Sequence, residues 1–191
     1  MRRATLIEDA FSRLEAASRC RDVYISSSKI EGLGLFAARS FVGGQRLYAD
    51  QNYYGRVQTI DYQQMKEFKI DVCRLFQVDV NRFALPEGTV DDFMNHSCEP
   101  NCGIRDYGDG YEIVALAEIA VNDEICFDYS TYMSEWPHAL VCRCGTRSCR
   151  KEIGPFESLP SSLRRYYLDQ GVVARFIKEQ IVPPVSSSDQ E

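Results

Sequence analysis

The stretch Asp92-Phe93-Met94-Asn95-His96-Ser97-Cys98-Glu99-Pro100-Asn101-Cys102 combines an amide, an imidazole, a hydroxyl, thiols and a rigid proline in one short segment with an apolar start. Side chains alternate along an extended strand, so Asn95 and Ser97 would share one face, and His96 and Cys98 the other. A single strand of this kind can serve two sites at once.

Three kinds of chemistry use such a segment. His96 and Cys98 form a candidate nucleophile pair, but a thiolate and its base also need a third, orienting group, which the segment does not supply. A metal site needs further soft ligands elsewhere in the chain. The remaining interpretation is a buried polar loop with an inert cysteine, and the segment considered alone favours it.

A second cysteine-rich stretch reverses this preference. Cys142-Arg143-Cys144-Gly145-Thr146-Arg147-Ser148-Cys149 places three thiols within eight residues. The start of the chain has no apolar signal core, and the acidic Glu8 and Asp9 argue against a transit peptide. We therefore expect an intracellular protein, cytoplasmic or nuclear and not secreted. In that reducing setting, clustered thiols are metal ligands more often than disulfides.

Composition limits the partners. The 191 residues are 45% hydrophobic and 26% charged, which fits one globular domain with short terminal additions. The net charge of −6 argues against direct nucleic-acid binding and favours a basic protein or peptide as partner. No stretch is long and apolar enough to predict a membrane span.

The remaining pattern predicts a mainly β fold with short helices, of the α+β class. Short alternating runs bounded by turn residues predict strands at 23–25, 45–49, 76–80, 111–115 and 125–129. Helical spacing of apolar residues predicts helices over 4–18 and 60–76, and two more beyond Ser158 that divide near Gly171.

Four motifs in order carry a resemblance to a known family. They are Gly32-Leu33-Gly34-Leu35-Phe36-Ala37, Asn95-His96-Ser97-Cys98-Glu99-Pro100-Asn101, Glu124-Ile125-Cys126-Phe127-Asp128-Tyr129 and the C-x-C-x4-C run. Together they resemble SET-domain protein-lysine methyltransferases with a post-SET zinc segment, over about residues 22–156. The resemblance implies several small sheets, with the second and third motifs meeting in a C-terminal pseudoknot.

The resemblance also divides the chain. It implies an N-terminal helical extension at 1–21, the SET domain at 22–134, the post-SET zinc segment at 135–156 and a C-terminal helical tail at 157–191. The family's long cysteine-rich segment before the SET domain has no counterpart in residues 1–21.

Site residues follow from the same resemblance. S-adenosyl-L-methionine would be held by the residues matching the first two motifs and the motif tyrosine: Leu33, Gly34, Leu35, Asn95, His96 and Tyr129. One structural Zn2+ would be held by Cys98, Cys142, Cys144 and Cys149, because a tetrahedral thiolate site needs a fourth sulfur beyond the local three. Cys102 is interpreted as a bystander.

Tyr129 is the expected catalytic residue. Methyl transfer needs a neutral amine, whereas lysine has a pKa of about 10.4 and is protonated at neutral pH. Desolvation in an apolar channel near the positive cofactor lowers that pKa, and a tyrosine can line the channel while its hydroxyl orients the amine.

The substrate channel is expected to be lined by Phe127, Tyr48, Tyr53 and Phe156. Phe127 at its position in the family leaves room for a methylated lysine to turn, so higher methylation states are predicted. Two departures put the channel in question: Asp92 stands where many relatives have arginine, and Asp50 where many have a channel tyrosine.

The leading hypothesis is therefore an S-adenosylmethionine-dependent protein-lysine N-methyltransferase acting on a basic, Lys-rich protein or peptide such as a histone tail. A catalytically silent, zinc-stapled binding module of the same fold is the alternative. A cysteine-dependent hydrolase that uses Cys98 and His96 is a third, weaker option.

Overall fold

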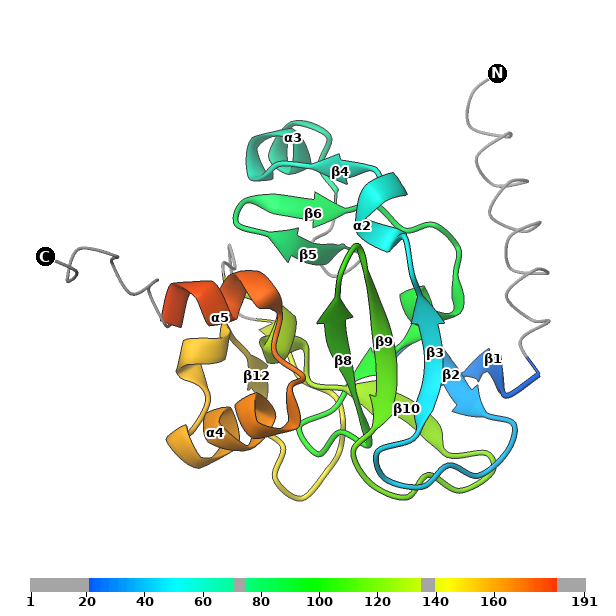
Figure 1. Cartoon of the computed structure of the whole chain (residues 1–191). Coiled ribbons are helices and arrows are strands. Elements are labelled where there is room, and N and C mark those ends of the chain that lie inside the picture. The colour runs from blue at the N-terminus through cyan, green and yellow to red at the C-terminus, as the bar shows by residue number, and fades with distance from the viewer. Residues whose placement is uncertain (1–20, 71–74, 135–139, 182–191) are drawn as a thin grey trace, which may run out of the picture.

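The computed structural model describes residues 21–70, 75–134 and 140–181 (Figure 1). The helix predicted over residues 4–18, and with it the N-terminal extension, lies outside the described residues, as do Cys20 and Cys73. In the described ranges, short strands dominate and helices are few. The expected mainly β architecture is confirmed.

The strands form four small sheets within these ranges. The first contains β1 (Val23–Ser27), β2 (Leu33–Ala37), β10 (Glu124–Phe127) and β7 (Asn95–His96) in that order. The second contains β3 (Arg46–Asp50), β9 (Gly110–Ala115) and β8 (Cys102–Tyr107). The third contains β4 (Thr59–Ile60), β6 (Arg82–Ala84) and β5 (Phe76–Asp79), and the fourth pairs β11 (Leu140–Val141) with β12 (Glu152–Ile153).

The first sheet brings three of the four sequence motifs together. β2 pairs antiparallel with β1 on one side and with β10 on the other, where Ile125 lies opposite Leu35. Beyond that point β10 leaves β2 and pairs in parallel with β7, with Phe127 opposite His96. The second and third motifs therefore meet side by side, as the resemblance implied.

The second sheet packs its buried residues into the same core as the first sheet. Its antiparallel strands place Ile104, Ile113 and Val114 in one buried cluster with Leu35 and Ile125 of the first sheet. Strand β8 was missed in the sequence pattern, because its first three residues, from Cys102 to Ile104, are buried in succession and do not alternate.

The helix predicted over residues 60–76 is wrong in its extent. Helix α3 spans only Tyr62–Glu67, where Asp61 starts it through a capping box with Gln64. Its end is set by Lys69, which has a φ of +53°. Phe68 is exposed, contrary to the expected buried face. Local apolar spacing suggested a helix, but sheet pairing takes Ile60 into β4 and Phe76 into β5.

The remaining helices are short, and two of them close the C-terminal side of the molecule. They are α2 (Tyr53–Arg56), the 3-10 helices η2 (Val90–Phe93), η3 (Tyr129–Tyr132) and η4 (Phe156–Ser158), and then α4 (Ser161–Gln170) and α5 (Arg175–Ile181). The predicted division near Gly171 is confirmed, since this residue ends α4 with a φ of +71°.

The link between α4 and α5 is part of the main core. Val172, Val173 and Ala174 are at most 1% exposed, and the Ala174 amide donates to the Thr131 carbonyl at 2.9 Å. The two helices, coloured orange to red in Figure 1, therefore pack against the body of the domain. Among the described helices, none has the length and apolar character needed to cross a membrane.

Candidate active site and metal site

The candidate active site lies where β2, β7 and β10 meet. The pairing of β10 with β2 ends at Leu35, so β10 does not pair with the backbone of Gly34 or Leu33. The side chain of Asn95 reaches this point instead. Its Nδ2 donates to the carbonyls of Leu33 at 3.1 Å and Glu31 at 3.2 Å, and thereby holds the turn that precedes β2.

Glu124 completes this arrangement. Its Oε1 accepts from Asn95 Nδ2 at 2.8 Å and from the Ser28 hydroxyl at 2.7 Å. A Cβ placed on Gly34 would overlap that same oxygen, so the second glycine of the Gly-x-Gly motif is needed for close approach. The sequence pattern placed Glu124 only in a turn, because a carboxylate at a strand start gives no local sign of partners 29 and 96 residues away.

The four cysteines expected to hold zinc are together. The sulfur atoms of Cys98, Cys142, Cys144 and Cys149 all lie within 4.8 Å of one another. Cys142 Sγ is 3.6 Å from the sulfurs of both Cys98 and Cys149. A tetrahedral Zn2+ with Zn–S bonds of about 2.3 Å separates its sulfurs by about 3.8 Å, so the donor set fits a structural zinc site.

Two backbone amides contact sulfur atoms of this cluster. The other described thiols, Cys102 and Cys126, are not part of it. The Arg150 and Cys144 amides point at the sulfurs of Cys98 and Cys142 at 3.3 and 3.5 Å. Cys102 is fully buried and donates to the Cys126 carbonyl at 3.2 Å, which agrees with its interpretation as a bystander. Desolvation raises the pKa of Cys102 well above its usual range, so it is an unreactive core thiol.

His96 connects the cysteine cluster to the motif tyrosine. Its Nε2 lies 3.3 Å from Cys98 Sγ, and its Nδ1 accepts the Tyr129 amide hydrogen at 3.2 Å. The pKa of the ring is lowered to about 4, mainly by burial, which outweighs the nearby Asp128 carboxylate. Both ring nitrogens of His96 thus contact protein atoms. These contacts do not test its expected role in cofactor binding, which stays a prediction.

Tyr129 is fixed at both ends. Its hydroxyl donates to the Met94 carbonyl at 2.8 Å, and its amide is held by His96. The residue begins η3 and is half-buried, with its ring 4.8 Å from Phe127 and 5.4 Å from His96 between centroids. The hydroxyl of Tyr129 is therefore held by Met94, just before β7, and its backbone by His96 within β7.

A row of aromatic rings extends from Tyr129 toward the second sheet. Successive ring centroids are 4.8 to 6.4 Å apart, and the row comprises Tyr129, Phe127, Phe76, Tyr53, Tyr111 and Tyr48. We call this set the aromatic row. It includes three of the four residues expected to line the channel. Phe76 and Tyr111 were missed, because the sequence pattern assigned them only to strands.

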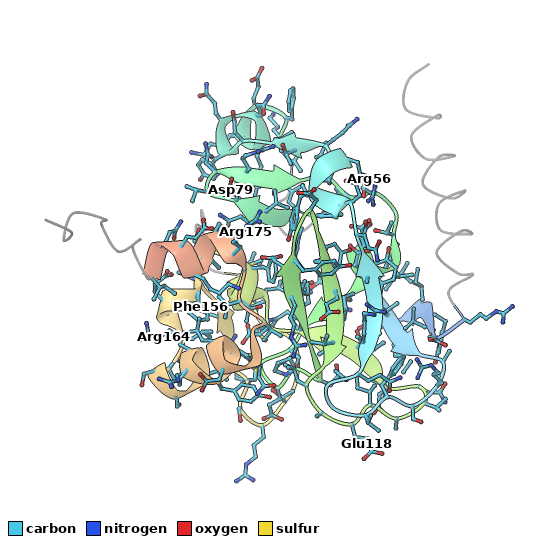
Figure 2. The ribbon with its side chains drawn as sticks, viewed as in Figure 1. Arg56, Asp79, Glu118, Phe156, Arg164 and Arg175 are labelled. Carbon is cyan, nitrogen blue, oxygen red and sulfur yellow. The ribbon has the colours of Figure 1, made fainter. Side chains whose placement is uncertain are left out.

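The fourth expected channel residue, Phe156, has a different setting. It is completely buried in the main core, and its amide donates to the Met133 carbonyl at 3.0 Å. Figure 2 places its label on the side of the molecule where helices α4 and α5 lie. A channel role for Phe156 stays a prediction. The contacts of its side chain are those of a residue packed in the main core.

The two departures from the family have structural roles of their own. Asp50 forms a bidentate ion pair with Arg56, with contacts of 2.6 and 2.7 Å, and the hydrogen bond to Arg56 lowers the pKa of Asp50. Asp92 accepts from the Gly88 and Thr89 amides at 2.6 and 3.2 Å and so caps η2. Neither carboxylate is left unpaired beside the aromatic row.

A cavity of about 360 Å³ lies between the cysteine cluster and α4. Its lining includes Cys98, Pro100, Arg150, Leu163 and Tyr167. The cavity is on the α4 side of the cluster and shows that Arg150 and Tyr167 face a common space.

The domain combines small sheets, a paired Asn-His strand, an anchored tyrosine and a four-cysteine cluster. This combination defines a class of protein, and comparison with known proteins shows which family that class is. The SET domain family model matches residues 32–130, just over half of the chain. The chain belongs to the SET domain family.

Curated relatives share this domain. The chain is 31% identical over 161 residues to human "Histone-lysine N-methyltransferase 2B", which covers 78% of this chain and 6% of the relative. It is 29% identical over 140 residues to "Histone-lysine N-methyltransferase trr" of Drosophila melanogaster, which covers 68% of this chain and 6% of the relative. The chain thus spans a small part of these relatives' length.

A solved structure supports the fold. The chain superposes with a TM-score of 0.50 and 19% identity on the "crystal structure of KRYPTONITE in complex with mCHG DNA and SAH". The likeness covers 69% of this chain and 29% of that one.

Proposed function

We propose that this protein is an S-adenosylmethionine-dependent protein-lysine N-methyltransferase. The observation that carries the proposal is the anchored Tyr129, which stands at the junction of the Gly-x-Gly strand, the Asn-His strand and the aromatic row. The human and Drosophila relatives are both named as histone-lysine N-methyltransferases, which supports the same activity.

The chemistry follows from the hydroxyl of Tyr129. Because it donates its hydrogen to the Met94 carbonyl, its oxygen can accept a hydrogen bond from an amine N–H. That contact would orient the lone pair of the lysine nitrogen. The buried rings of Phe127 and Tyr53 desolvate the amine and lower its pKa, which favours the neutral, nucleophilic form.

The residues of the first motif fit the cofactor. Where β10 leaves β2, the backbone of Leu33 and Gly34 adjoins the strand of Asn95 and His96, and the Asn95 amide holds this backbone in place. When bound, S-adenosylmethionine supplies the methyl group. Leu33, Gly34 and Leu35 would hold it through backbone atoms, together with Asn95, His96 and Tyr129.

The four-cysteine cluster would hold one structural Zn2+. Cys98 belongs to the second motif, whereas Cys142, Cys144 and Cys149 follow η3, so a bound ion would join two parts of the chain that are 44 residues apart at Cys98 and Cys142. Its role is to fix the segment after β11 against the Asn-His strand. The segment from 140 to 156 is accordingly the described part of the proposed post-SET unit.

We propose a basic protein, such as a histone tail, as the substrate, because the chain carries a net charge of −6 and its relatives are named for histone lysine. A nuclear location follows from that substrate. The same charge keeps direct nucleic-acid binding outside the proposal, and the DNA of the solved complex is a ligand of that other protein.

Labelled S-adenosylmethionine and a panel of basic proteins test the activity. We expect methyl transfer to lysine by the wild type and its loss in Tyr129→Phe, whereas the exposed Tyr107→Phe serves as control and keeps the activity. Equal labelling by wild type and Tyr129→Phe would contradict the role of the tyrosine.

The silent binding module is the competing hypothesis, and titration calorimetry separates the two. Micromolar binding of S-adenosylmethionine is expected of the enzyme, and no detectable heat is expected of the module. The hydrolase hypothesis requires a free Cys98 thiol, which the cysteine cluster disfavours. Resistance of Cys98 to alkylation until a chelator is added would exclude it.

A further inference from the structure

The buried carboxylate of Asp128 joins four parts of the structure immediately before the motif tyrosine. The residue is 1% exposed. Its Oδ1 accepts from Arg150 Nη2 at 2.7 Å and from the Ser130 amide at 3.1 Å. It also lies 3.5 Å from His96 Nδ1. A carboxylate withdrawn from water to this degree depends for its stability on donors such as Arg150 and the Ser130 amide, whereas His96 Nδ1 is itself an acceptor.

The remaining oxygen of Asp128 is bound by helix α4. The hydroxyl of Tyr167 on α4 donates to Asp128 Oδ2 at 3.1 Å. Tyr167 is 1% exposed, and burial, with the neighbouring Asp128 charge, raises the pKa of its phenol far above the usual range. It therefore acts as a permanent donor. The family match ends at residue 130, so Tyr167 lies outside it.

The hydrogen bond between Tyr167 and Asp128 is connected to Tyr129 through neighbouring residues of η3. Asp128 is the residue before Tyr129 and caps η3, because its side chain accepts from the Ser130 amide. The Tyr129 amide in turn bonds to His96, and the C-terminal link bonds to the same 3-10 helix at the Thr131 carbonyl. A change in the position of the Asp128 carboxylate therefore alters the first turn that carries Tyr129.

We propose that Tyr167 is a positioning residue for Tyr129, acting through Asp128, and that the C-terminal helix α4 is consequently part of the active centre. The inference rests on the proposed methyltransferase function for its kinetic consequence. Its structural consequence, a hold on η3, does not depend on any activity.

The adjacent residue provides a matched control. Tyr166 lies on the same helix but is 42% exposed, so Tyr166→Phe removes a hydroxyl of the same kind from the surface. In methyl-transfer assays we expect Tyr167→Phe to lower kcat about tenfold, the change that corresponds to one hydrogen bond to a charged group, with KM for the cofactor nearly unchanged. Tyr166→Phe is expected to keep the wild-type kcat.

Hydrogen exchange read by mass spectrometry supplies the second measurement. In a peptide covering 124–134, Tyr167→Phe should speed amide exchange, and Tyr166→Phe should not. A double-mutant cycle with Asp128→Asn should show non-additive effects on this exchange, since both changes remove the same contact. A purely structural role of Tyr167 would instead lower the melting temperature and leave the exchange of this peptide like that of the control.

The outcomes separate the two proposals. If the wild type transfers no methyl group, the proposed function fails, and exchange in the 124–134 peptide still decides the positioning role. If methyl transfer occurs and Tyr167→Phe matches Tyr166→Phe in both kcat and exchange, the positioning role is overturned while the enzyme assignment stands.

Discussion

The Nε2 atom of His96 lies 3.3 Å from the sulfur of Cys98, while Nδ1 of the same ring accepts the Tyr129 amide hydrogen. A neutral imidazole carries one hydrogen, so the acceptor role of Nδ1 places that hydrogen on Nε2, facing the sulfur. His96 thus donates to a proposed zinc ligand and holds the backbone of the proposed catalytic residue.

This contact predicts that His96 supports metal binding without being a ligand. Replacing His96 by Ala removes a hydrogen bond to a ligand sulfur, and losses of this kind weaken metal binding by about 10- to 100-fold. Competition with a chromophoric chelator measures the change. Cys102→Ser, which lies outside the cluster, is the control and should bind metal as tightly as the wild type. Unaltered affinity in His96→Ala would contradict the prediction.

The metal content itself is predicted to follow the cluster. We expect one zinc per chain by elemental analysis, and its loss in Cys144→Ser, because three sulfurs leave the tetrahedral site incomplete. Cys126→Ser should retain the metal, since Cys126 stands outside the cluster. Chelation of the wild type should also lower the melting temperature, because the ion joins Cys98 to the segment that begins at Cys142. Full zinc content in Cys144→Ser would argue against the assigned ligands.

Asn95 is predicted to act on cofactor affinity through the backbone. Asn95→Ala removes the donor that holds the carbonyls of Leu33 and Glu31, so we expect the Kd for S-adenosylmethionine to rise about tenfold, equivalent to about 1.4 kcal/mol. Isothermal titration measures it. Asn52→Ala, whose side chain makes no capping bond at the start of α2, should leave the Kd unchanged. A similar loss in both variants would point to a general effect on folding.

Phe127 is predicted to set the methylation state. The ring packs 4.8 Å from Tyr129 and 6.4 Å from Phe76. A hydroxyl added in Phe127→Tyr would occupy space beside the amine and bind a water molecule or the amine itself. We expect di- and trimethyl products from the wild type and mainly monomethyl product from the variant, as read by mass spectrometry. Strictly monomethyl product from the wild type would refute this.

Gly110 is predicted to be indispensable to the second sheet. A Cβ at this position would overlap the Asp50 carbonyl oxygen, a backbone atom that cannot move aside cheaply. Gly110→Ala should therefore destabilise the fold by about 3 kcal/mol or more. Gly43→Ala is the control, because the nearest atom would be 3.8 Å away. Urea denaturation measures the stability of both variants. Equal unfolding midpoints for Gly110→Ala and Gly43→Ala would contradict the prediction, because they would mean that the backbone at Asp50 moves aside easily.

Much of the fold was accessible from local sequence. Turn residues and alternation located strands such as β1, β3 and β9, and Gly171 marked the end of α4, because these signals depend on neighbouring residues alone. The helix over 60–76 failed for the opposite reason. Its apolar spacing fits a helix, but pairing with β6, whose strand begins at Arg82, places both of its ends in strands.

Membership in the family could be read from the sequence, because each motif is contiguous in the chain, and the resemblance to that family also indicated the four clustered cysteines. The hydrogen-bond partners of Asn95, the place of Phe76 and Tyr111 in the aromatic row, and the hydrogen bond from Tyr167 to Asp128 became visible in the folded chain alone. These contacts connect residues far apart in the chain. They depend on strand register and helix placement, which no local pattern encodes.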